Sequence, residues 1–108
     1  MGLRLPTATR AVRLRSRVFV PDALDRDAGD GRTLGVAVGA LAHDGRRLRL
    51  DGAGFGAGWY PPEQAWRWTD GDATLLFDPL PRPSLLRVRT VAAGARYWVE
   101  AEALRGAA

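Results

Sequence analysis

Apolar and polar residues alternate along several short stretches of the chain, and this two-residue period predicts β-strands. In the stretch 11–20, AVRLRSRVFV, one set of alternate positions is mainly apolar, and the other holds three arginines and a phenylalanine. We expect the first set to face a core and the second to face solvent, as in an antiparallel sheet that is covered on one side. The predicted core set comprises Val12, Leu14, Ser16, Val18 and Val20.

A second alternating stretch, 33–43, has the sequence TLGVAVGALAH. One of its two sets nearly lacks side chains, which indicates a close approach by another layer or a β-bulge. The Asp44–Gly45 pair that follows is a strong signal for a two-residue hairpin turn, and it leads into a returning strand with Leu48 and Leu50. The predicted core set of the stretch comprises Leu34, Val36, Val38, Ala40 and Ala42.

The C-terminal half adds predicted strands at residues 72–77, 84–91 and 95–104. Because only three residues separate the last two stretches, we expect them to pair as a hairpin in which arginines of one strand face glutamates of the other. Helix propensity leaves a short C-terminal helix open as an alternative, but the alternation favours a strand.

Together these stretches predict an all-β fold. Short strands with turns every eight to twelve residues or so are typical of an antiparallel β-sandwich. We predict a jelly-roll-like sandwich of seven or eight short strands, running from about residue 9 to residue 104. The length of 108 residues fits a single domain, 1–108, that buries its own core.

The positive charge of the chain comes from arginine, because lysine is absent, as are cysteine, asparagine and isoleucine. A GC-rich bacterial genome produces this pattern through its codons. The net charge of +4 would otherwise indicate a polyanionic partner, but arginine has replaced lysine throughout, so we predict no nucleic-acid partner. No apolar run approaches the roughly 18 residues of a transmembrane helix, so no membrane span is expected. The oligomeric state is not predicted.

Two loops carry residues that bind ions in other proteins. The acidic loop 22–30 lacks the closing glutamate of an EF-hand calcium loop, so we interpret it as a polar turn and leave calcium binding open. The glycine-rich loop 51–58 is not followed by the helix that a phosphate-binding loop needs. No cofactor is predicted. The aspartates of the acidic loop are Asp22, Asp25, Asp27 and Asp30.

Residues with catalytic potential are sparse. His43 is the only histidine, and a Ser–His–Asp arrangement would need Ser16 or Ser84, neither of which lies in the sharp turn typical of a nucleophile. A glycosidase would need two carboxylates at a defined separation, and almost any domain offers such a pair. We therefore predict that the chain is not an enzyme and has no catalytic or metal-binding residues. The carboxylate pairs considered are Glu63 with Asp70 and Glu63 with Asp72.

The segment 58–73, GWYPPEQAWRWTDGDA, concentrates large aromatic residues beside prolines and acidic residues. In one interpretation it is a structural clasp over one end of the sandwich, with tryptophans as a buried lid and an arginine–glutamate pair that holds it closed. The clasp residues are Trp59, Glu63, Arg67 and Trp68. In the other interpretation it is a sugar-binding surface, whose rings stack on the sugar while its carboxylate accepts hydroxyl protons. The ligand-binding residues are Trp59, Tyr60, Glu63 and Trp66.

The same segment carries a motif that reads G-W, then E, then R-W-T-x-G, then A-x-L. Its positions are Gly58, Trp59, Glu63, Arg67, Trp68, Thr69, Gly71, Ala73 and Leu75. Over about residues 9–98 the chain resembles the small β-sandwich module attached to bacterial Hint-domain (hedgehog/intein-like) proteins and to some bacterial glycosyltransferases. The resemblance implies a non-catalytic accessory or interaction module of a larger bacterial protein system, with other protein domains or a glycan as partners. A carbohydrate-binding module is the alternative function, and a glycan-processing enzyme is the third.

Overall fold

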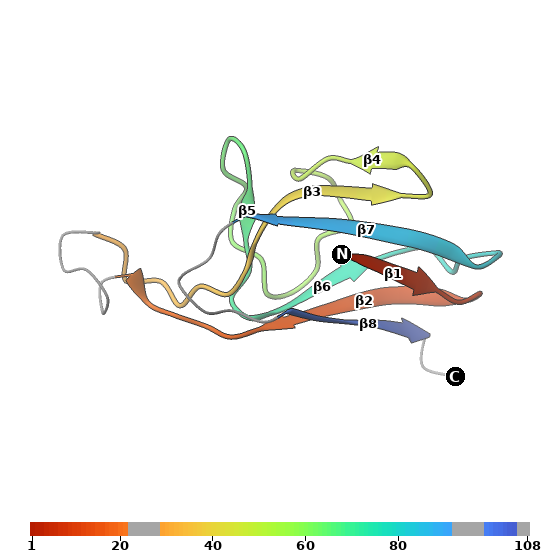
Figure 1. Cartoon of the computed structure of the whole chain (residues 1–108), viewed down its shortest axis with the longest axis horizontal. Coiled ribbons are helices and arrows are strands. Elements are labelled where there is room, and N and C mark those ends of the chain that lie inside the picture. Colours follow the sequence, from red (N-terminus) through yellow and green to blue (C-terminus); the bar gives the residue numbers. More distant parts are fainter. Residues whose placement is uncertain (22–28, 92–98, 106–108) are drawn as a thin grey trace.

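The computed structural model describes residues 1–21, 29–91 and 99–105, and the elements that it forms there are β-strands in antiparallel pairs (Figure 1). The predicted all-β, antiparallel fold is confirmed. The eight strands are β1 (Gly2–Leu5), β2 (Thr9–Ser16), β3 (Ala37–His43), β4 (Arg46–Leu48), β5 (Arg67–Trp68), β6 (Asp72–Leu76), β7 (Ser84–Val91) and β8 (Val99–Arg105).

The strands form two sheets that share one core. One sheet has the order β1-β7-β3-β4, and β5 pairs with the edge of β3 that also carries β4; the other sheet has the order β6-β2-β8. Aliphatic side chains from both sheets are fully buried together, as expected for two sheets that pack face to face. The jelly-roll connectivity stays a prediction. The core cluster comprises Leu5, Val12, Leu14, Val38, Leu41, Leu75, Leu86 and Val88.

Strand β2 confirms the first predicted strand over most of its length. Val12 and Leu14 are completely buried, and Ser16 is buried beside them. The strand ends at Ser16, however, and Val18 is 47% exposed, so its predicted core position is wrong. Beyond β2, Phe19 forms an isolated antiparallel bridge with Leu34, and both residues lie outside the named strands.

A β-bulge in β3 changes the predicted phase of that strand. Val38 is fully buried as predicted, but the register of β3 against β7 shifts between Val38 and Ala40. The extra residue moves the alternation by one position, so Leu41 enters the core while Ala40 and Ala42 turn to the opposite face. The predicted core positions of the two alanines are therefore wrong.

The turn after β3 is the one that its sequence predicts. Asp44 and Gly45 both have positive φ, 48° and 79°, and His43 pairs with Arg46 across them. Positive φ at both central residues defines the type I′ turn, whose twist matches that of the flanking strands.

The predicted hairpin between the last two strands is wrong. Strand β7 pairs with β1 and β3 in one sheet, whereas β8 pairs with β2 in the other. Alternation defines the faces of a strand but not its neighbours, and β1, which was not predicted, occupies the edge of β7. The expected arginine–glutamate pairing does occur, but with arginines of β2: Arg15 bonds to Glu100 at 3.0 Å.

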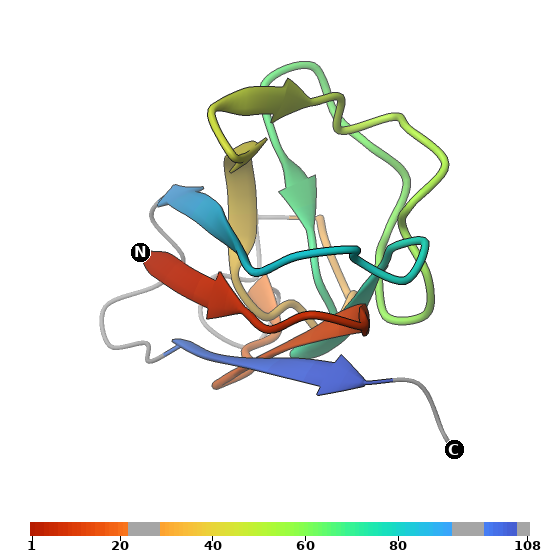
Figure 2. The ribbon, with the colours of Figure 1, turned by 90° about the vertical axis from the view of Figure 1, so that its right-hand side faces the viewer.

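Viewed end-on, the sheets curve around the core (Figure 2). On one side β1 and β8 lie next to each other. On the other side, residues 49–57 run from β4 to β6 and bond to the free edge of β6, where Gly56 donates to Thr74 and Leu76 donates to Gly54. A glycine-rich segment therefore covers an edge strand that would otherwise expose unpaired backbone groups.

Candidate functional site

The aromatic segment forms a hairpin arm, defined here as residues 59–69, that projects from the edge of β3 (Figure 1). Trp59 bridges Thr69 at its base, the Tyr60 amide donates to the Trp68 carbonyl at 3.0 Å, and Glu63 closes the tip by donating to Trp66 at 2.9 Å. The arm is thus tied by backbone hydrogen bonds from base to tip.

The base of the arm depends on residues of the motif. Gly58 has φ of +88°, and a Cβ atom there would collide with the Asp72 carbonyl, so the position requires glycine. Thr69 is fully buried, and its hydroxyl donates to the Val36 carbonyl at 3.0 Å. Gly71 also has positive φ, +102°, against Val18. These three motif residues therefore shape the base of the arm.

Trp59 lies at the base of the arm and packs against the core. Its side chain is half-buried against the core cluster, and its indole N–H donates to the Thr74 carbonyl at 2.9 Å. The ring meets the Phe55 ring edge-on at a centroid distance of 4.7 Å. Both the ring and its polar atom are therefore engaged within the protein.

Arg67 holds the arm, but its partners differ from the predicted one. Its Nε donates to the Tyr60 carbonyl at 2.7 Å, its Nη1 donates to the Leu50 carbonyl at 2.8 Å, and its guanidinium lies 4.4 Å from the centre of the Phe55 ring. Burial lowers the pKa of Arg67 from the usual arginine value. Glu63 pairs instead with Arg32, at 3.8 Å, and none of the described ion pairs joins it to Arg67, so the predicted Arg67–Glu63 pair is wrong.

Tyr60 is also engaged within the protein. Its hydroxyl donates to the Thr33 carbonyl at 2.7 Å, and the Arg32 guanidinium lies 5.1 Å from its ring centre. Arg32 in turn binds both carboxylate oxygens of Asp30. Asp30 therefore belongs to this contact, whereas Asp22, Asp25 and Asp27 of the acidic loop lie outside the described residues, and calcium binding there stays open.

The tryptophans do not form one stacking surface. Trp66, at 37% exposure, lies near the tip of the arm. Trp68 is half-buried, less than the clasp predicts, and its ring meets Phe19 at 5.8 Å. The aromatic side chains are thus divided among separate contacts, and of the predicted ligand-binding residues Trp66 has the most exposed ring.

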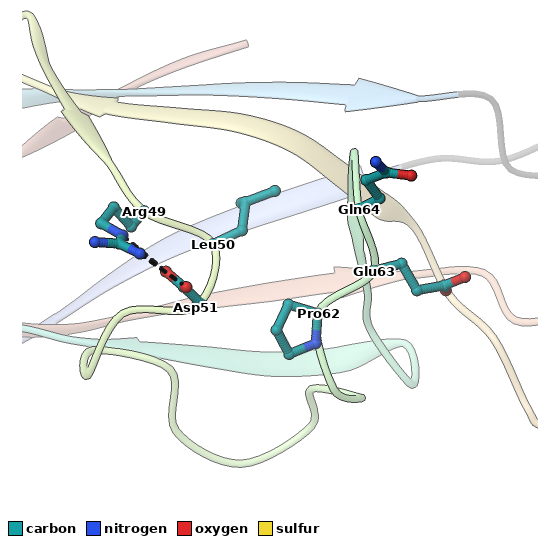
Figure 3. Close-up of a pocket in the computed structure, with 6 residues that line it drawn as sticks. All are labelled: Arg49, Leu50, Asp51, Pro62, Glu63 and Gln64. Atoms are coloured by element: carbon teal, nitrogen blue, oxygen red, sulfur yellow. Dashed lines mark hydrogen bonds and ion pairs between the residues drawn. The ribbon is translucent and has the colours of Figure 1, made fainter.

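A hollow of about 520 Å³ lies between the arm and the loop that follows β4 (Figure 3). Arg49 and Asp51 form one wall and bond to each other twice at 3.0 Å. Pro62 forms the facing wall, and the side chains of Glu63 and Gln64 point away from the Arg49–Asp51 pair (Figure 3). The residues that line the hollow are Arg49, Leu50, Asp51, Pro62, Glu63 and Gln64.

Arg49 and Asp51 also stabilise each other's charged forms. Hydrogen bonds from Arg49 lower the pKa of Asp51, and those to Asp51 raise the pKa of Arg49. Asp51 is therefore ionised at neutral pH and can accept hydrogen bonds, but it is not a proton donor there. Of these residues, the sequence analysis proposed only Glu63 as ligand-binding. The others lie in loops, where no hydrophobic periodicity marks them.

The structure brings one serine–histidine pair together. His43 Nε2 lies 2.7 Å from Ser84 Oγ, and the imidazole ring packs against Phe77 at 5.4 Å. In the described residues no carboxylate is bonded to this imidazole, and Ser84 begins a strand that is paired with β1. A carboxylate or other third group that orients the base is part of the catalytic arrangement in serine hydrolases, so the pair alone makes no such centre.

The remaining catalytic alternatives are used by the fold. The Ser16 hydroxyl donates to the Arg17 carbonyl and accepts from the Val36 amide. Asp72 binds Arg13 through both oxygens, and that contact lowers the pKa of Asp72. Asp70 accepts from the Asp72 amide. Within the described ranges no group of three histidine, cysteine or acidic side chains is placed to hold a metal ion.

Comparison of this chain with protein-family models, curated proteins and solved structures finds no match. The resemblance to Hint-associated modules therefore stays a prediction. The described part of the chain contains no helix that is long and apolar enough to span a membrane.

Proposed function

We propose that this chain is a non-catalytic interaction module whose ligand site is the hollow between residues 49–51 and 62–64. The observation that supports the proposal most directly is the position of Arg67. Its guanidinium binds Leu50 in one wall and Tyr60 at the base of the arm that forms the other. One half-buried side chain thus links both walls, and a site that is formed in advance loses less free energy on binding.

The chemistry of the hollow favours a polar ligand of low net charge. Its lining supplies the Arg49 guanidinium and the Asp51 carboxylate, together with the apolar surfaces of Leu50 and Pro62, while the side chains of Glu63 and Gln64 point away from the charged pair. A donor and an acceptor lie side by side, which suits a ligand with hydroxyl groups, such as a carbohydrate. The volume of about 520 Å³ lies in the range of small-molecule sites. Trp66, two residues after Gln64 in the sequence, carries an exposed aromatic ring.

Binding is favoured over catalysis because the pKa shift of Asp51 is opposite to that of a general acid. A glycosidase needs one carboxyl group with a raised pKa and a second that stays ionised. Arg49 lowers the pKa of Asp51, which is opposite to the shift that a general acid needs. This proposal agrees with the accessory role that the resemblance implies.

The test is a glycan array with the isolated domain, followed by calorimetric titration of any glycan that binds. Replacements Arg49→Gln and Asp51→Asn remove charged groups from the hollow, whereas Glu102→Gln removes an exposed carboxylate from the other sheet. We expect weak binding, with a dissociation constant near 1 mM, which corresponds to a binding free energy of about −4 kcal/mol. The replacements in the hollow should abolish it and Glu102→Gln should not. Failure of the parent domain to bind any glycan would refute the carbohydrate assignment.

A further inference from the structure

The outer face of the larger sheet carries a row of exposed arginines, and it shares no lining residue with the hollow. Arg47 on β4 and Arg87 on β7 are both paired with Ala42 of β3, so their side chains leave the same face on either side of a small residue. Arg89 is paired with Ala40 in the next row. We call this surface, Ala40 and Ala42 with Arg47, Arg87 and Arg89, the trough.

The β-bulge explains why the trough has a low floor. Because the bulge turns Ala40 and Ala42 outward, methyl groups lie between the long arginines of the neighbouring strands. A depression of about 300 Å³ results, and Met1, Leu41 and Val88 complete its lining. Gly39, beside the floor, has the Arg89 guanidinium within 3.8 Å of the place that a Cβ atom would take, so that side chain extends across β3.

The charge of the trough is not balanced within the described part of the chain. Arg13, Arg15, Arg32 and Arg49 each form an ion pair with a carboxylate, whereas none of the described ion pairs includes a trough arginine. The acidic residue closest along β3, Asp44, uses its carboxylate to accept from the Leu85 amide at 2.8 Å. The trough therefore presents three arginine side chains, whose guanidinium groups match carboxylates bidentately.

We infer that the trough binds an acidic segment of a partner protein in extended conformation, with its carboxylates on alternate residues. Arg87 and Arg89 are two residues apart on one strand, so they repeat at about 6.7 Å. Alternate side chains of an extended peptide repeat at the same distance, and a peptide that lies along β3 would have Arg47 on its other side.

The lining of the trough disfavours a single-stranded nucleic acid. Proteins that bind such strands combine basic grooves with aromatic side chains on which bases stack. The trough is lined by arginine, alanine and aliphatic residues, and no aromatic side chain contributes to it in the described structure.

The test measures fluorescence anisotropy of a synthetic peptide with alternating glutamate and threonine. The double variant R87E/R89E reverses the charge of the trough. The double variant R17E/R105E makes the same change in net charge at two exposed positions of the other sheet and its flank. An exposed ion pair changes an affinity by up to about fivefold, so R87E/R89E should weaken binding about tenfold or more. R17E/R105E should change it about twofold at most, and thermal unfolding of both variants should match the parent.

Three comparisons make the result decisive. A peptide of the same composition with its glutamates in one block should bind more weakly, and high salt should weaken both complexes. The inference is overturned by equal binding of the two peptides, by equal losses in the two double variants, or by tighter binding of a single-stranded oligonucleotide of equal charge. Absence of peptide binding also overturns it. The hollow variant Asp51→Asn should change peptide binding about twofold at most, which separates this surface from the proposed glycan site.

Discussion

Replacement of Arg67 by methionine tests whether this side chain holds the hairpin arm to the rest of the fold. Methionine keeps most of the aliphatic length and removes the guanidinium. The change leaves the Tyr60 and Leu50 carbonyls without their described donor, and it removes the cation–π contact with Phe55. The arm and the loop that follows β4 then lose their common attachment.

The expected magnitude follows from these contacts. A hydrogen bond from a charged donor contributes about 1.5–3 kcal/mol, and a cation–π contact about 0.5–2 kcal/mol. Removal of a partly buried charge returns some of this free energy, because burial already lowers the pKa of Arg67. We expect Arg67→Met to lower the free energy of unfolding by about 2–4 kcal/mol. Arg67→Lys should lower the free energy of unfolding by roughly half as much, since an ammonium group cannot donate to both carbonyls with the geometry of the planar guanidinium.

The assay is urea unfolding followed by tryptophan fluorescence, with Arg49→Met as the matched control. Arg49 makes two hydrogen bonds to Asp51, but its side chain is 83% exposed, so its loss should leave the free energy of unfolding nearly unchanged. Equal losses in the two variants, or a loss below about 1 kcal/mol for Arg67→Met, would refute the role assigned to Arg67.

Three further outcomes are expected from the same unfolding assay. Gly58→Ala should lower the free energy of unfolding by more than about 1 kcal/mol, because positive φ and the Asp72 carbonyl both exclude a Cβ atom; a neutral effect would contradict the geometry of the base. Trp66→Ala should change it by less than about 0.5 kcal/mol, since that side chain is exposed; a larger loss would place Trp66 in the core. Arg13 lowers the pKa of Asp72, so this pair stabilises the fold above the unfolded pKa of about 3.9, and the contribution disappears as pH falls through the folded pKa. Asp72→Asn should therefore reduce the loss of stability between about pH 5 and pH 2, and an unchanged acid profile would count against the pair.

The parts of the fold that were predicted correctly are those that local alternation determines. Val12 and Leu14 lie in the core as their two-residue period requires, and Asp44–Gly45 forms the turn that its composition favours. The errors lie where a non-local event intervenes. One bulge beside Gly39 reversed the phase of Ala40 and Ala42, and the sheet that accepts β8 is decided by packing rather than by the short connection before it.

The candidate site was less predictable because backbone groups build much of it. The sequence suggested a carboxylate as the partner of Arg67, whereas the partners are two carbonyl groups, which every residue possesses. Arg67 also lies opposite the buried Val38, on the core side of the sheet. A charged residue on a core face is contrary to the simple pattern, and such exceptions often occur where a fold positions a site.

The two sheets have a consequence for how the chain folds. Strand β1 finds its neighbour in β7, and β2 finds one of its neighbours in β8; the Arg15–Glu100 pair joins residues that are 85 positions apart. Each sheet is completed only when the beginning of the sequence meets its last quarter. Proteins dominated by such distant pairings fold on timescales of about milliseconds to seconds, far more slowly than helical bundles of similar size. During synthesis, the edges of β1 and β2 therefore stay uncovered until almost the whole chain has been made. The arginines on β2 lower the risk that this strand pairs with another chain in that interval.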